Sequence, residues 1–162
     1  MLRRLELNDM DQAARVHRAS FDHALPWLAG LHTPDEDRWF YRERVFKTCT
    51  LWGAFDAAVM TGIIAFRDGW IDQLYVMPEA QGRGRGGALL DVAMRTSDRL
   101  QLWTFQRNLR ARGFYEARGF KLVERTDGSR NEENEPDALY LWTRSSPRIT
   151  EPDILPPPSR PM

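Results

Sequence analysis

The alternation of apolar and polar residues along the chain predicts an ordered series of strands and helices. Three runs, 48–55, 59–66 and 70–76, are rich in β-forming residues and are separated by short turns, so they predict a three-stranded meander. Apolar residues recur at helical spacing over 10–21, from 34 to about 46, over 89–94 and over 111–118. Further strands are predicted over 2–7, 100–105, 120–124 and 139–142.

The resulting order is β-α-α-β-β-β-α-β-α-β-β, with one strand–helix–strand unit in the middle of the chain. That unit favours a parallel strand pair, whereas the other connections allow antiparallel pairing. We therefore predict an α+β fold with a mixed, mostly antiparallel central sheet flanked by helices. Residues 1–144 suit a single domain. Residues 145–162 carry six prolines and few apolar residues, which predicts a disordered tail.

The composition of the chain gives no indication of a nucleic-acid partner, a metal site or a membrane segment. The chain has 23 Lys plus Arg and 23 Asp plus Glu, so no basic field indicates a nucleic-acid partner. Cys49 is the only cysteine, and the three histidines lack ligand spacing, so no metal site is predicted. The N-terminal segment has no signal-peptide core, and no run approaches the roughly 18 apolar residues of a membrane span. We predict a cytoplasmic protein without a membrane partner.

A glycine-rich segment, "YVMPEAQGRGRGGALL" (75–90), joins a predicted strand to a predicted helix. Unpaired amides and a partial positive charge at a helix N-terminus suit phosphate, and glycines let a ligand approach the backbone. Arg83 and Arg85 are expected to add charge-assisted contacts to phosphate oxygens. The alternative is a flexible surface turn with solvated arginines. The four glycines are Gly82, Gly84, Gly86 and Gly87.

Three phosphate-binding motifs compete for this segment. A Walker loop ends in Gly-Lys-Ser/Thr, whereas residues 86–88 are Gly-Gly-Ala. The dinucleotide pattern GxGxxG is matched at 82–87, which keeps a nicotinamide-dependent enzyme as an alternative. Five residues, 77–81, separate that pattern from the strand, although the fingerprint normally follows the strand directly. The third pattern, Gln/Arg-x-x-Gly-x-Gly/Ala, is matched at 81–86.

In this setting the third pattern resembles the GNAT superfamily of acyl-CoA-dependent N-acetyltransferases, in particular a bacterial, poorly characterised branch. The resemblance covers the element order over roughly residues 2–144 and implies a GNAT-like fold. It also implies an enzyme that moves an acetyl group from acetyl-CoA, its cosubstrate, to a primary amine. The segments that carry the resemblance are "IDQLYVMPEAQGRGRGGALL" (71–90), "LQLWTFQRN" (100–108) and "ARGFYEARGF" (111–120), with "LHTPDED" (31–37) and residues 126–142 for the branch.

The resemblance further implies roles for individual residues in a cofactor site. The amides of 82–87 would hold the coenzyme A pyrophosphate, and the strand edge at 74–76 would pair with the pantetheine arm. An amide near Leu74 would polarise the acetyl carbonyl, Asn108 would bind the pantetheine end and Tyr115 would lie near the sulfur. The residues expected to bind acetyl-CoA are Leu74, Tyr75, Val76, Gln81, Gly82, Arg83, Gly84, Arg85, Gly86, Gly87, Asn108 and Tyr115.

The chemistry of direct amine attack on a thioester asks for an acid and a base but no protein nucleophile. A phenol, with an ordinary pKa of about 10, can protonate the thiolate leaving group, so Tyr115 is the candidate acid. Its helical spacing alone equally suits a core tyrosine. Asp72, on the strand expected to hold the thioester, is the candidate base, with a solvent-facing strand residue as the alternative.

The resemblance also implies that the acidic connection 126–137 lies near the acceptor side of the cleft, so the acceptor site is predicted there. Its crowded carboxylates are Glu132, Glu133, Glu135 and Asp137. Clustered carboxylates raise the local concentration of a cationic amine, although a charge run is also typical of a solvated surface. His32 lies in a loop that would cover this site. The expected partner is a small-molecule or peptide amine, and the sequence leaves monomer and homodimer open. A non-catalytic acyl-CoA-binding module is the second functional hypothesis.

Overall fold

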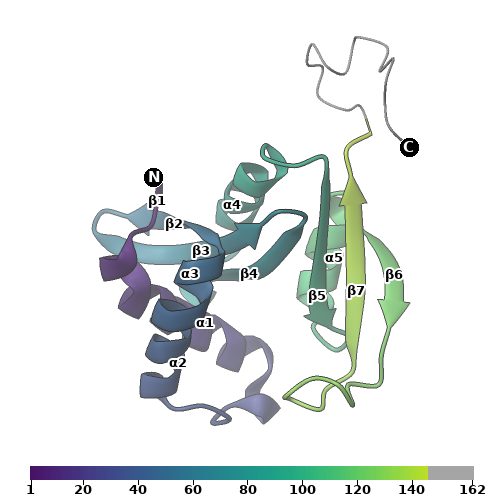
Figure 1. Ribbon diagram of the computed structural model, residues 1–162, viewed down its shortest axis with the longest axis horizontal. Helices are drawn as coiled ribbons and strands as arrows, with labels where there is room; N and C mark the ends of the chain where they lie inside the picture. The colour runs from purple at the N-terminus through teal and green to yellow at the C-terminus, as the bar shows by residue number, and fades with distance from the viewer. Residues whose placement is uncertain (146–162) are drawn as a thin grey trace, which may run out of the picture.

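The computed structural model describes residues 1–145, which form a seven-stranded sheet with helices on both faces (Figure 1). The predicted α+β class and element order are confirmed. No helix among the described residues has the length and apolar character needed to cross a membrane. The strands are β1 (Leu2–Arg4), β2 (Thr50–Asp56), β3 (Val59–Arg67), β4 (Trp70–Val76), β5 (Arg99–Phe105), β6 (Lys121–Arg125) and β7 (Asp137–Thr143), and the helices are α1 (Met10–Ala24), α2 (Pro34–Phe40), α3 (Phe46–Thr48), α4 (Arg85–Met94) and α5 (Leu109–Ala117).

Two predicted segments differ in detail from what is observed. The segment expected as a helix from 34 to about 46 is helical throughout, but a π-helical turn at Tyr41–Val45 lies between α2 and α3. The first strand ends at Arg4, since a 3₁₀ turn begins at Leu7. The predicted tail lies, from residue 146 onward, outside the described residues.

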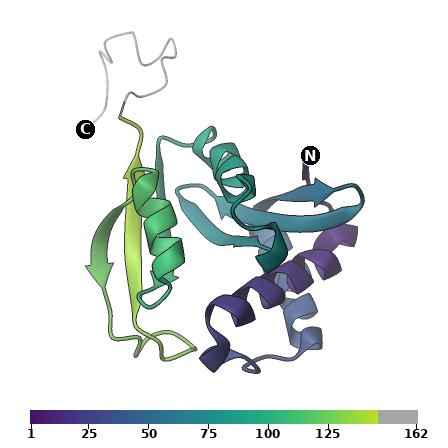
Figure 2. The same cartoon turned by 180° about the vertical axis from the view of Figure 1, so that it is seen from behind.

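The central strand β3 explains how the sheet carries helices on two faces. Successive side chains of a strand point to opposite faces. Ile63 and Ala65 pack with α1 and the 34–48 helices, whereas Ile64 and Phe66 pack with α4 and α5. Because both faces are covered, β3 is an almost continuous apolar run. Figure 2 shows α4 and α5 on the face opposite to that seen in Figure 1.

The sheet opens between β4 and β5, its one parallel pair, with strand order β1-β2-β3-β4-β5-β7-β6. The two strands share a single registered pair, Trp70 with Gln101, and diverge beyond it (Figure 1). A bulge at Asp72 accompanies the divergence, since Ala65 faces Gln73 while the next residue of β3 faces Ile71. A bulge bends and twists its strand. The bulge therefore turns β4 away from β5, which stays paired with β7.

Candidate active site

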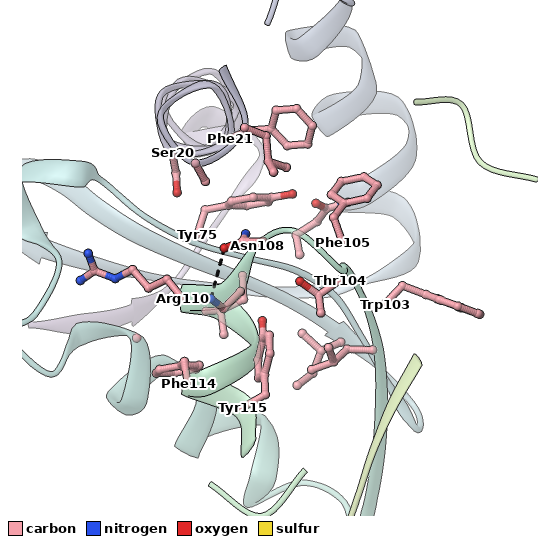
Figure 3. A pocket seen from close by; sticks show the side chains of 18 of the residues that line it. Ser20, Phe21, Tyr75, Trp103, Thr104, Phe105, Asn108, Arg110, Phe114 and Tyr115 are labelled. Atoms are coloured by element: carbon pink, nitrogen blue, oxygen red, sulfur yellow. Dashed lines mark hydrogen bonds between the residues drawn. The ribbon is translucent and has the colours of Figure 1, made fainter. Parts of the chain in front are cut away.

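A cavity of about 990 Å³ lies where β4 and β5 diverge. Its walls come from β4, β5, α5, the C-terminal part of α1, the glycine segment before α4 and the β6–β7 connection. Figure 3 shows Phe21, Tyr75 and Phe105 at one side of this cavity and Phe114 and Tyr115 at another. The opening in the sheet therefore brings together segments that are up to about a hundred residues apart in sequence.

The edge of β4 presents backbone groups to the cavity. The Met77 amide donates to the Thr61 carbonyl (2.8 Å), and hydrogen-bonded pairs alternate along an antiparallel ladder. By this alternation, the amides and carbonyls of Leu74 and Val76 face away from β3 and toward the opening. The Val76 carbonyl accepts a hydrogen bond from Gln81 Nε2 (3.0 Å). The other three backbone groups are available to an extended ligand.

The glycine segment forms a cradle of unpaired amides. Gly82 and Gly84 have φ values of +78° and +81°, which L side chains rarely adopt. None of the amides of residues 82–87 donates a hydrogen bond within the described part of the chain. The first amide in the helical ladder is that of Ala88, which donates to Gly84 (3.0 Å). A row of free donors at the N-terminus of α4 suits an anion.

The side chains of Arg83 and Arg85 do not contribute to this cradle as expected. Both Nη2 contacts of Arg85 go to the Asp56 carboxylate (2.5 Å), and neither arginine lines the cavity. The physical reason is that the β2–β3 turn brings a carboxylate next to the start of α4. The backbone amides of these two residues remain part of the cradle.

The arginines that do line the cavity beside the glycines come from α5. Arg118 lies over the Phe114 ring (3.9 Å), and its Nη2 is 2.9 Å from where a Cβ on Gly87 would stand. Arg110 Nη2 lies at a corresponding distance of 4.0 Å from Gly82. The sequence held a signal for this pair, because residues 110, 114 and 118 are one turn apart and share a helix face. Only the fold shows that this face meets the glycines.

Tyr115 projects from α5 with its hydroxyl at the cavity. Its ring packs edge-on against Phe114 (5.2 Å) and Phe120 (5.5 Å), and the hydroxyl makes no hydrogen bond within residues 1–145. Burial raises the pKa of Tyr115 above its ordinary value, so the phenol stays protonated. Asn108 caps the same helix, accepting from the Ala111 amide through Oδ1 (3.2 Å), which leaves its Nδ2 group free to donate.

Asp72, the bulge residue, also lines the cavity. Its Oδ2 accepts from Arg67 Nε (2.7 Å) and from Cys49 Sγ (3.3 Å). Burial, more than these contacts, raises the pKa of the Cys49 thiol to about 11, so the thiol is a donor at neutral pH. The side chain of Asp72 is 28% exposed. One carboxylate oxygen is thus held in place, while the other has no hydrogen-bond partner within residues 1–145.

An ion pair between the buried carboxylate of Glu135 and the exposed guanidinium of Arg107 connects the loops around the cavity. Glu135 is 4% exposed and accepts two hydrogen bonds from Arg107 (2.8 and 2.9 Å) and one from Trp27 Nε1 (3.1 Å). The hydrogen bonds from Arg107 lower the pKa of Glu135, and the guanidinium also stacks over the Trp27 ring (4.0 Å). This contact links the α1–α2 connection to the β6–β7 connection.

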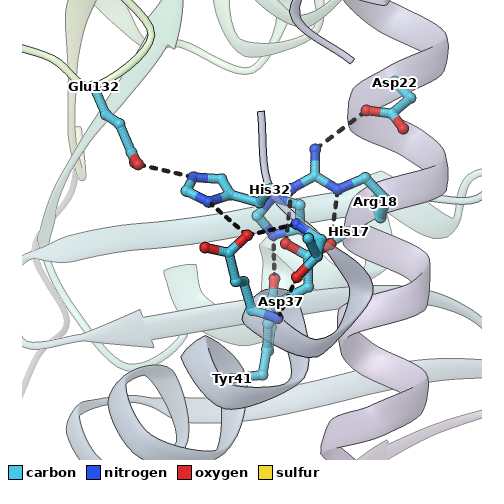
Figure 4. A network of polar contacts seen from close by, with 9 residues as sticks. His17, Arg18, Asp22, His32, Asp37, Tyr41 and Glu132 are labelled. Atoms are coloured by element: carbon cyan, nitrogen blue, oxygen red, sulfur yellow. Dashed lines mark hydrogen bonds and ion pairs between the residues drawn. The ribbon is translucent and has the colours of Figure 1, made fainter. Parts of the chain in front are cut away.

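A second link lies beside it. His32 Nε2 is 2.9 Å from the Glu132 carboxylate (Figure 4). The structure therefore brings these two predicted acceptor residues together, but neither they nor Glu135 line the cavity. Of the predicted acidic set, Glu133 and Asp137 line it. No group of three or more His, Cys, Asp or Glu side chains in the described chain could hold a metal ion.

The chain is similar to known proteins in sequence and in fold. It is 38% identical over 81 residues to "Probable N-acetyltransferase Rv2775" of Mycobacterium tuberculosis, covering 48% of this chain and 47% of that protein. The chain spans about half the length of the curated relatives it matches.

Solved structures show the same fold at low identity. Apo-form YjaB from Escherichia coli has a TM-score of 0.75 at 21% identity, covering 90% of this chain and 98% of its own. The structure of yncA from Salmonella typhimurium, with its cofactor acetyl-CoA, has a TM-score of 0.67 at 16% identity, covering 93% and 97%. The family model described as "Acetyltransferase (GNAT) domain" matches residues 32–122, more than half of the chain. The chain therefore belongs to the GNAT family of acetyltransferases.

Proposed function

We propose that the protein transfers the acetyl group of acetyl-CoA to a primary amine by direct attack in a ternary complex. The observation that carries the proposal is the opening between β4 and β5. The free backbone groups of Leu74 and Val76 lie on one side of it, the unpaired Tyr115 hydroxyl lies on the other, and the amide cradle of 82–87 adjoins both. The nicotinamide alternative is set aside because the chain belongs to an acetyltransferase family.

The residues present fit acetyl-CoA. The amides of 82–87 would hold its diphosphate, with Arg110 and Arg118 supplying positive charge from α5. The Leu74 and Val76 backbone groups would pair with the pantetheine amides as an added strand. Asn108 would donate its free Nδ2 hydrogens to the end of that arm. When bound, acetyl-CoA supplies the activated acetyl thioester.

Three groups of the chain would then serve the reaction. The Leu74 amide would donate to the acetyl oxygen, where negative charge develops as the amine attacks. Tyr115 would give its proton to the departing sulfur, since burial keeps the phenol protonated. Asp72 would accept the proton of the amine through its unpaired oxygen, directly or through a water molecule.

The cofactor site is tested with a matched pair of glycine variants. Gly84 and Gly69 both have positive φ and open space where a Cβ would stand, so valine strains the two positions alike. Gly84→Val would fill the cradle and should weaken acetyl-CoA binding, measured by calorimetry, at least about tenfold. Gly69→Val, in the β3–β4 turn, should bind as the wild type does. Equal binding by the two folded variants would remove the cradle from the site.

Turnover is tested separately, by following free thiol while purified protein and acetyl-CoA are screened against a panel of amines. Acetyl transfer to any amine of the panel would support the proposal that the protein is an acetyltransferase. Acetyl-CoA binding with no transfer to any amine would identify a non-catalytic acyl-CoA-binding module instead.

A further inference from the structure

The three glutamates of the β6–β7 connection differ in what they contact. Glu132 pairs with His32, and Glu135 is buried against Arg107 and the Trp27 indole. Both carboxylates therefore already have a protein partner, and both side chains lie outside the cavity lining. Glu133, between them, is half-buried, lines the cavity and makes no hydrogen bond or ion pair within residues 1–145.

The surroundings of Glu133 indicate where its charge acts. Burial is the first cause that raises the pKa of Tyr75, and the charge of Glu133 is the second. Glu133 and Tyr75 line the same cavity, so the charge of this carboxylate acts on a phenol of the cavity wall. Arg18, the cation that opposes this effect on Tyr75, is held by Asp37 and Asp22. A partly buried carboxylate without a protein partner favours binding of a cation from solution.

One wall of the cavity that Glu133 lines is aromatic. Phe21 of α1 and Phe105 of β5 pack edge to face in this wall, with ring centroids 6.1 Å apart, and Tyr75 lies next to them (Figure 3). Such walls suit methylene groups, because burying each one contributes about 0.8 kcal/mol. The aromatic faces also favour a nearby cation.

We propose that Glu133 binds the far, non-reacting ammonium group of a small diamine acceptor, whose methylene chain lies along Phe21 and Phe105. The inference rests on the proposed acetyl transfer and specifies its substrate. The reacting amine, neutral when it attacks, points toward the opening between β4 and β5. The second ammonium stays charged and pairs with the carboxylate.

Arg130 is a charge of opposite sign to Glu133 in the same cavity lining, so it tests the charge preference of the acceptor site. It also lines the cavity from the β6–β7 connection but is exposed, and no carboxylate of the described chain lies within ion-pair distance of it. Its charge repels a diammonium acceptor and would attract an acceptor that carries a carboxylate. Removing it should therefore lower KM for a diamine, whereas for an amino-acid acceptor the same change should raise KM.

The test compares three acceptors in which a chain of five carbons joins the reacting amine to a different end group. The end group is an ammonium in cadaverine, hydrogen in pentylamine and a carboxylate in aminocaproate. For the wild type, kcat/KM should favour cadaverine over pentylamine about tenfold or more, as expected for a hydrogen bond between charged groups. Glu133→Gln should bring that ratio close to one. Glu132→Gln, a matched charge removal beside it, should preserve the ratio, and Arg130→Gln should lower KM for cadaverine. Thermal melting checks that each variant is folded.

The outcomes separate this inference from the proposed transfer. A wild-type ratio near one, an unchanged ratio in Glu133→Gln, or aminocaproate as the best acceptor would overturn the diamine assignment while leaving acetyl transfer intact. Calorimetry of cadaverine on the coenzyme A complex reads the subsite without turnover. Binding that is lost in Glu133→Gln sustains the subsite even if no acetyl transfer occurs, and no binding together with no transfer overturns it.

Discussion

Replacing Tyr115 with phenylalanine isolates the chemistry of one hydroxyl. The ring contacts with Phe114 and Phe120 are preserved, and the hydroxyl has no hydrogen-bond partner among the described residues. No buried partner is left unsatisfied by the change. The free energy of unfolding should therefore change by less than about 1 kcal/mol.

The effect on catalysis should be much larger. A general acid contributes about 10²–10⁴-fold to the rate. At about 1.36 kcal/mol per tenfold change, this corresponds to roughly 3–5 kcal/mol of the activation barrier. Because burial raises the pKa of Tyr115, the wild-type kcat should not fall through loss of this proton up to the ordinary phenol pKa of about 10.

Tyr140→Phe is the matched control, because this tyrosine is buried but does not line the cavity. Its hydroxyl donates to Glu116 Oε2 (2.6 Å) and accepts from Arg112 Nε (2.9 Å). Hydrogen bonds to charged groups contribute about 1.5–3 kcal/mol, so this variant should lose stability while its kcat stays near the wild-type value.

The assay measures thiol release at saturating acetyl-CoA between about pH 6 and 10, the range over which the buried phenol should stay protonated. Kd for acetyl-CoA and Tm are measured beside it. Tyr115→Phe should keep its Kd and Tm and lose kcat, whereas Tyr140→Phe should keep its Kd and kcat and lose Tm. A folded Tyr115→Phe with wild-type kcat across this range would show that the phenol is only a packing residue.

Three further changes have defined outcomes. Asp72→Asn removes the proposed base and should lower kcat at least about tenfold; an unchanged kcat would leave proton removal to solvent. Gly113 lies inside α5 with open space on the side where a Cβ would project, so Gly113→Ala should stabilise the protein by about 0.5–1 kcal/mol in denaturant unfolding, and a loss of stability would contradict the open geometry. Burial lowers the pKa of His17 to about 3, so the unfolded state takes up its proton first as pH falls, and stability should drop by roughly 2 kcal/mol between about pH 6.5 and 5. His17→Gln should remove most of that slope, and a slope equal to that of the wild type would assign it to other groups.

The order of elements and the anion cradle were predictable from the sequence because both depend on local features. Alternation and helical spacing depend on the geometry of a single strand or helix, and Gly82 and Gly84 adopt positive φ within the short segment 82–87, whose amides are uncovered. The α+β class follows from the same order. The spacing did not indicate the π-helical turn at Tyr41–Val45, which changes the hydrogen-bond pattern within a segment that was expected as one α-helix.

The partners of the charged side chains depended on the tertiary structure. The side chain of Arg85 hydrogen-bonds Asp56. The arginine side chains that lie beside the cradle glycines are instead Arg110 and Arg118. The acidic run likewise appeared uniform in sequence. In the fold, however, Glu132 contacts His32 and Glu135 contacts Arg107, whereas Glu133 between them lines the cavity. A charge finds its partner through space, so its sequence neighbours do not reveal which groups will neutralise it.

The opening of the sheet is the clearest case of a feature decided by tertiary structure. The sequence indicated strands near 70–76 and 100–105 and a helix between them, which is enough to predict a parallel pair. How far the pair extends depends on the bulge at Asp72 and on the pairing of β5 with β7, both of which involve hydrogen bonds to other strands. Because β4 is bonded to β3 and β5 is bonded to β7, the two strands separate after a single registered pair and the sheet opens between them. The backbone groups that remain unpaired at that edge form the proposed site.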